Sequence, residues 1–84
     1  MRYEVLIEKK AERQLARIAD PEYSRIKQAI SQLADTPRPP SSKKLKGRDA
    51  LRIRVGDYRV IYQVKDKQLL VLVVEVGHRR EVYR

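Results

Sequence analysis

The amino-acid sequence predicts an α+β fold: an N-terminal strand, a two-helix hairpin, then a three-stranded antiparallel meander, with the helices packed on one face of the sheet. Two observations support this prediction. Apolar residues recur at helical spacing through the first half of the chain, whereas from Leu51 onward they alternate with polar residues. Between the halves, the proline-rich residues 36–42 cannot continue a helix. A helical layer and a sheet of this size fit a single domain, residues 1–84.

The first half opens with a short apolar-rich segment, Tyr3–Ile7, which is typical of a strand. The first helix then has an apolar stripe at Ala11, Leu15 and Ile18. Asp20-Pro21 predicts the start of the second helix, with aspartate as the N-cap and proline at the first helical position. The apolar stripe of that helix consists of Tyr23, Ile26, Ile30 and Leu33.

The second half predicts three strands joined by tight turns. Leu51–Val55 is followed by the turn signal Gly56-Asp57, and Tyr58–Lys65 by Asp66-Lys67. Leu69–Val76 is almost entirely apolar, so we expect a central strand covered on both faces.

Composition excludes several classes of protein. The chain has 84 residues with no cysteine and one histidine, which rules out a disulfide framework, a thiolate metal site and a site of several imidazoles. No apolar run is long enough to span a bilayer, and the N-terminus lacks the apolar segment of a signal peptide. We therefore expect a cytoplasmic protein with no metal, no cofactor and no membrane partner.

The net charge of +9 is concentrated in the second half of the chain. Residues 1–36 hold 7 basic and 6 acidic side chains, whereas residues 37–84 hold 13 basic and 5 acidic ones. Such an asymmetry predicts one basic face, which attracts phosphate backbones. Charge alone also fits an acidic protein partner, an anionic membrane or a merely soluble surface.

Three arginines of the predicted sheet are the first candidates for chemistry. Arg52 and Arg54 share one face of their strand, because side chains alternate along it, and Arg59 follows the next turn. If the helices cover the apolar face, these guanidinium groups lie on the open face, where each can grip phosphate oxygens with two hydrogen bonds. The alternative is an ordinary solvated strand face.

The tail after the last strand carries further candidates. It contains Arg79 and Arg80 with the aromatic ring of Tyr83, a combination that RNA-binding proteins use for phosphates and unpaired bases. Histidine is the residue type suited to proton transfer near neutral pH, so His78 could serve as acid or base, or it is simply a polar residue at a strand end. Glu81 either accepts a proton or pairs with a neighbouring arginine.

A second basic cluster follows the proline-rich segment. It consists of Lys43, Lys44, Lys46 and Arg48. In a loop these cations would position a nucleic-acid backbone without reading its sequence, or they would form a solvated charged surface.

Three segments, taken together and in their order along the chain, resemble the RelE family of toxins, within the wider RelE/ParE superfamily. They are Lys43-Lys44-Leu45-Lys46-Gly47, residues 51–62 (LRIRVGDYRVIY) and residues 76–83 (VGHRREVY). The resemblance covers nearly the whole chain, although no single short segment is diagnostic.

The resemblance implies a toxin of a type II toxin–antitoxin system. Members of the RelE family enter the ribosomal A site and cut messenger RNA without a metal. A ribose 2′-hydroxyl attacks the adjacent phosphate, leaving a cyclic phosphate and a free 5′-hydroxyl. A RelB-like antitoxin silences the toxin, and operator DNA is contacted only through that antitoxin.

The family's catalytic cations and tail tyrosine correspond to Arg52, Arg54, Arg59, Arg79 and Tyr83. Some family members have lysine where this chain has Arg52 and Arg54, and arginine does not lose its proton. A general base must then be Tyr83, His78 or Glu81, unless positioning and charge stabilisation suffice. The C-terminal helix of some relatives has no counterpart before Arg84.

Two other functions compete with the nuclease. A ParE-like toxin of the same fold inhibits DNA gyrase, and it would not need the arginine and tyrosine set. A non-catalytic RNA-binding or ribosome-associated module would use the same basic face without cleavage. A supercoiling assay distinguishes the first alternative, and loss of turnover in a Tyr83 variant distinguishes the second.

Overall fold

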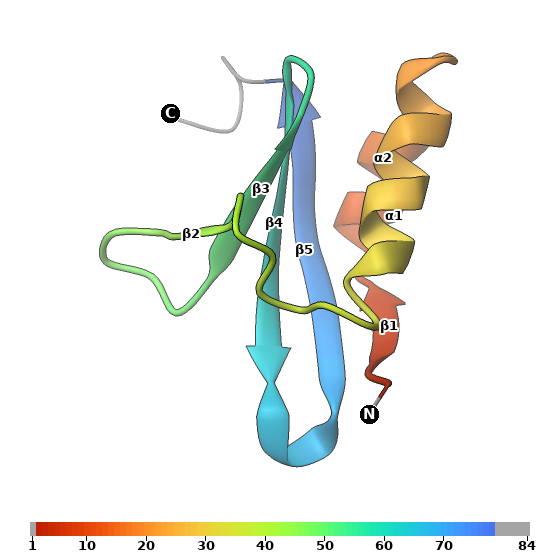
Figure 1. The fold of residues 1–84 in the computed structure, drawn as a ribbon. Helices are drawn as coiled ribbons and strands as arrows, with labels where there is room; N and C mark the ends of the chain where they lie inside the picture. Colours follow the sequence, from red (N-terminus) through yellow and green to blue (C-terminus); the bar gives the residue numbers. More distant parts are fainter. Residues whose placement is uncertain (1, 79–84) are drawn as a thin grey trace.

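The computed structural model describes residues 2–78, and the α+β prediction is confirmed (Figure 1). Two helices, α1 (Lys9–Ala16) and α2 (Glu22–Gln32), lie against one face of a five-stranded sheet. The strands follow the order β1-β5-β4-β3-β2 across the sheet. Their bounds are β1 Glu4–Ile7, β2 Lys43–Lys44, β3 Leu51–Val55, β4 Tyr58–Lys65 and β5 Leu70–His78, with a short 3-10 helix at Asp66–Gln68.

The sheet is mixed. β1 pairs in parallel with β5, while β5, β4, β3 and β2 are antiparallel neighbours. The predicted meander is therefore present, and the N-terminal strand extends it on the far side of β5. The prediction of a loop at Lys43 and Lys44 was wrong, because these residues form the short edge strand β2. The connection back to β3 is tight, since the Leu45 N–H donates to the Ala50 carbonyl oxygen at 2.9 Å.

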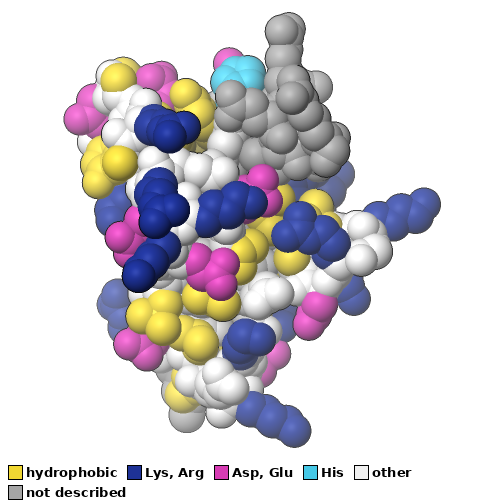
Figure 2. Space-filling model, turned by 180° about the vertical axis from the view of Figure 1, so that it is seen from behind, with side chains coloured by type: hydrophobic (Ala, Val, Ile, Leu, Met, Phe, Trp, Pro, Cys, Tyr) yellow, Lys and Arg dark blue, Asp and Glu magenta, His cyan; other side chains and the backbone are white. Residues whose placement is uncertain are grey.

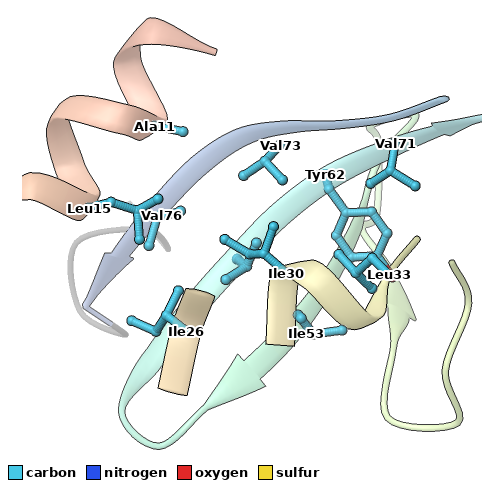
Figure 3. Close-up of a cluster of buried hydrophobic side chains, with 11 residues drawn as sticks. Ala11, Leu15, Ile26, Ile30, Leu33, Ile53, Tyr62, Val71, Val73 and Val76 are labelled. Atoms are coloured by element: carbon cyan, nitrogen blue, oxygen red, sulfur yellow. The ribbon is translucent and has the colours of Figure 1, made fainter. Parts of the chain in front are cut away.

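The core lies between the helices and the sheet (Figure 3). The predicted stripes face it, with Ala11 and Leu15 from α1 and Ile26 and Ile30 from α2. Ile18 packs against this core from beyond the end of α1, which is shorter than the stripe predicted. At the start of α2, the Asp20 carboxylate accepts hydrogen bonds from the Ser24 N–H and hydroxyl at 3.0 and 2.6 Å.

β5 is central, but its two faces are unequal. Val71, Val73 and Val76 are fully buried against the helices. Leu70 and Leu72, which point to the other face, are only half-buried. The prediction that this strand is covered on both faces was therefore wrong, since helices lie on one side only.

The proline-rich linker is fixed to the sheet by a polar network. The buried Tyr62 hydroxyl donates to the Pro37 carbonyl oxygen at 2.8 Å. Asp66 accepts a hydrogen bond from the Tyr3 hydroxyl at 2.6 Å and two from the Arg38 guanidinium at 3.1 and 2.9 Å. These hydrogen bonds, Arg38 first, lower the pKa of the Asp66 carboxyl from 3.8 to about 2.

We expect Asp66→Asn to make the free energy of unfolding vary less with pH in the acid range. A lowered folded-state pKa stabilises the fold above the unfolded value of 3.8, and that contribution is lost as pH falls toward about 2. Urea unfolding at a series of pH values should show the variant less stable than the parent near neutrality, with the difference shrinking as pH falls from about 4 through about 2. A difference between them that is the same at every pH would contradict this role.

No helix in the described part of the chain is long and apolar enough to cross a membrane.

Candidate functional site

Four cations gather on the sheet face that the helices do not cover. Residues directly opposite one another in an antiparallel pair point to the same face. Arg54 lies opposite Arg59, and Lys43 lies opposite Arg52, so the register brings β2, β3 and β4 together here. We call Lys43, Arg52, Arg54 and Arg59 the arginine face.

The members of the arginine face differ sharply in exposure. Arg59 and Arg52 are only 2% and 7% exposed, whereas Arg54 and Lys43 are exposed. The sequence predicted cations on an open face but not that two of them are buried. Both buried arginines have interaction partners within the molecule, as burial of a charge requires. Two guanidinium groups are thus held in place, while two cations remain accessible to solvent.

A glycine of the neighbouring strand β5 lies beside the arginine face. The residue opposite Arg59 on β5 is Gly77, which has no side chain to project toward the guanidinium. The nearest acid along β5 is Glu75, opposite Ile61. Its carboxylate lies 3.7 Å from the Lys10 ammonium at the start of α1. Sequence reasoning did not identify Gly77 or Glu75, because only the strand register reveals them.

His78 lies on the other side of the sheet. It is directly opposite Tyr58, and Tyr58 packs against the core on the helix side. The two rings meet edge to face with their centroids 5.6 Å apart. Hollows of about 400 and 270 Å³ flank this pair. The sheet therefore separates the histidine from the arginine face.

The predicted lysine cluster is divided by its strand. Lys43 belongs to the arginine face, whereas Lys44 lies opposite Leu51 and so points to the other face. Lys46 and Arg48 are exposed in the turn between β2 and β3. The remaining predicted site residues, Arg79, Arg80, Glu81 and Tyr83, lie outside the described residues.

A cleft lies next to the arginine face, between the helical layer and the sheet. A cleft of about 530 Å³ runs between α2 and β3, with Ala29, Leu33 and Ile53 among its walls and Arg54 at its rim. Among residues 2–78 there is no group of three or more His, Cys, Asp or Glu side chains that could hold a metal ion.

Comparison with known proteins connects this geometry to toxins. The family model described as the ParE toxin of the type II toxin–antitoxin system parDE matches residues 5–83. A RelE-like toxin protein from Escherichia coli is 30% identical over 81 residues, covering 94% of this chain and 85% of the relative.

Solved structures agree. The crystal structure of the archaeal RelE–RelB complex from Pyrococcus horikoshii contains a chain that is 29% identical, with a TM-score of 0.81 and coverage of 96% of this chain and 99% of that chain. The isolated Escherichia coli RelE toxin is 28% identical, with a TM-score of 0.79 and coverage of 96% and 90%.

The fold and these matches define a toxin component of a type II toxin–antitoxin system. The chain belongs to the ParE toxin family, within the RelE/ParE superfamily, and its structural neighbours are RelE toxins.

Proposed function

We propose that this toxin is a ribosome-dependent endoribonuclease that cuts messenger RNA in the A site. The observation that carries the proposal is the arginine face, with Arg52 and Arg59 buried and held beside the exposed Arg54. Cations fixed in advance stabilise charge that develops on a reacting phosphate without having to reorganise. The similarity to RelE toxins supports the same reading.

In the proposed reaction, the ribose 2′-oxygen attacks the adjacent phosphorus and the bond to the 5′-oxygen breaks. The 2′-hydroxyl proton goes to a base, and the leaving 5′-oxygen takes up a proton. The products are a 2′,3′-cyclic phosphate and a free 5′-hydroxyl. Arg52, Arg54 and Arg59 would bind the phosphate oxygens and stabilise the additional negative charge of the pentacoordinate transition state.

Proton transfer needs a group other than these arginines, since a guanidinium stays charged. His78 lies across the sheet from the arginine face, so the proposed mechanism does not use it. We propose that Tyr83 or Glu81 takes this role, and that Arg79 completes the set of cations around the phosphate. Lys46, Arg48 and Arg80 would hold the RNA or ribosome backbone together with Lys43 and Lys44.

A RelB-like antitoxin is the proposed silencing partner, and the cytoplasm is the proposed location of the toxin. Several structural neighbours are complexes of RelE with RelB, which supports a partner of this kind. The apolar wall of the cleft between α2 and β3, with Arg54 at its rim, offers a surface for an antitoxin segment beside the arginine face. Operator DNA would be bound only through the antitoxin.

The test is to express the toxin under tight control and map the 5′ ends of cellular messenger RNA by primer extension. We expect new breaks within translated codons that disappear when translation is blocked. Arg79→Ala and Tyr83→Phe should each relieve growth arrest while the fold is retained. Efficient cutting of free RNA by the purified toxin would contradict the requirement for the ribosome.

Gyrase inhibition is the second candidate, because the matching family model is that of ParE toxins. Growth arrest with intact messages, together with loss of supercoiling by purified gyrase in the presence of the toxin, would favour it. If neither message cleavage nor gyrase inhibition is observed, a non-catalytic RNA-binding module becomes the favoured function.

A further inference from the structure

A row of cations runs along the outer side of α1. Lys9 and Arg13 lie in the helix, and Arg17 caps its end, so the three follow one another at four-residue intervals. Side chains at this interval share one side of a helix. With a rise of about 1.5 Å per residue, neighbouring members are about 6 Å apart along the axis. We call Lys9, Arg13 and Arg17 the α1 row.

The α1 row is exposed, and one acid, Glu12, stands in the same helix. All three side chains are exposed. Other cations of the N-terminal half do have acidic partners, since Lys10 pairs with Glu75 at 3.7 Å and Arg2 with Asp35 at 3.8 Å. Within the described part of the chain, no member of the α1 row forms an ion pair.

Part of this arrangement opposes helix stability. Like charges four residues apart repel one another, and Lys9 stands in the first turn, where the helix dipole favours acidic residues. Arg13 in the last turn and Arg17 at the C-cap are placed where the dipole favours cations. A sequence that keeps an unfavourable local arrangement commonly does so at a functional surface. The balance of charge in residues 1–36 conceals the α1 row, because acids elsewhere in that half offset it.

The α1 row faces away from the sheet. Ala11 and Leu15 turn the inner side of α1 toward the core, and the row lies on the opposite side of the helix. Figure 2 shows Lys and Arg side chains gathered one above another over this part of the surface. The arginine face lies beyond the helices on the uncovered side of the sheet. The molecule therefore presents cations in two opposed directions.

We propose that the α1 row is a second RNA-binding surface that holds the phosphate backbone of structured RNA while the arginine face engages the message. Regular cations without base-reading groups suit a repeating chain of phosphates. A protein partner would need an apolar centre to its interface. The one exposed large hydrophobic residue of the described chain, Leu6, is in β1 rather than in this helix.

The inference rests on the proposed function, since a ribosome would supply structured RNA on both sides of the toxin. Its test is separate from cleavage. We would measure the affinity of purified toxin for a fully paired RNA hairpin by fluorescence anisotropy over a series of salt concentrations. The variant is Lys9→Gln with Arg13→Gln and Arg17→Gln. The matched control is Lys27→Gln with Lys65→Gln and Lys67→Gln, which removes the same charge from exposed positions elsewhere.

We expect the row variant to lose about two to three units of the slope of log affinity against log salt, at roughly 0.9 per phosphate contact. The control should keep a slope close to that of the parent. Glutamine is a good helix former and removes the repulsion, so the variant should fold.

Equal slopes for the row variant and the control would overturn the proposal, as would a parent toxin that does not bind the hairpin. The proposal would also be overturned if the row variant keeps the parental RNA affinity but no longer co-purifies with the antitoxin. That result would assign the α1 row to binding an acidic protein. If the row variant loses hairpin binding but the parent cuts no message, the α1 row stands and the nuclease proposal fails.

Discussion

Replacing Arg59 with alanine should lower the rate of ribosome-dependent message cleavage about 100- to 1,000-fold, the usual loss when one preorganised charge-stabilising donor is removed from an active site. Arg59 is the most buried cation of the arginine face, at 2% exposed, and Gly77 lies opposite it on β5. Its guanidinium is therefore held in place before RNA arrives. Single-turnover cleavage of message on purified ribosomes measures the effect directly.

Two further variants separate loss of chemistry from loss of fold. Arg54→Ala removes the exposed cation opposite Arg59 and should leave the packing intact while still slowing cleavage. Arg59→Lys keeps the charge but loses the fork of donors, so it should restore only part of the activity. If Arg59→Ala binds antitoxin, unfolds like the parent and cuts at the parental rate, the arginine face is not the catalytic surface.

Replacing Ile26 with alanine should destabilise the toxin by about 2–5 kcal/mol. This side chain is fully buried between α2 and the sheet, where its removal leaves a cavity. A domain has only about 5–15 kcal/mol of total stability, and a small one lies near the lower end. The variant should therefore keep only about 0–3 kcal/mol of stability, which urea unfolding of the purified protein would measure.

Leu6→Ala is the matched control for the core. Leu6 is 45% exposed, so the same loss of apolar atoms should cost much less than at Ile26. Antitoxin binding should partly restore the stability of the Ile26→Ala variant, because a ligand that binds only the folded state stabilises that state. Equal losses at the two positions would mean that the helical layer contributes little to stability.

The sequence predicts the elements well because their signals are local. The stripes at Ala11–Leu15 and Ile26–Ile30 face the core as their spacing requires. The two-residue turn at Gly56-Asp57 fixes the register of β3 and β4, and this register places Arg54 opposite Arg59.

The features that sequence reasoning missed depend on pairing between distant segments. β2 consists of two lysines with no apolar alternation, so only its partner strand defines it. The position of His78 depends on an irregularity in the ladder between β4 and β5, at Ile61 and Tyr62. A single extra residue in a strand reverses which face the following side chains occupy. Val73 and Val76 consequently share the helix side, and His78 follows Val76 there rather than joining the arginines.

The two edges of the sheet affect the tendency of the toxin to aggregate. Unpaired strand edges invite another chain to add on, which leads to aggregation. β1 ends at Ile7 and so covers only part of the β5 edge. Farther along β5, the Val76 N–H donates a hydrogen bond to the Gln14 side-chain oxygen at 2.7 Å. At the opposite edge, β2 is short and carries Lys43 and Lys44, whose charges oppose pairing with a strand of another molecule. The same lysines that we assign to RNA thus also protect the protein against fibre-like association.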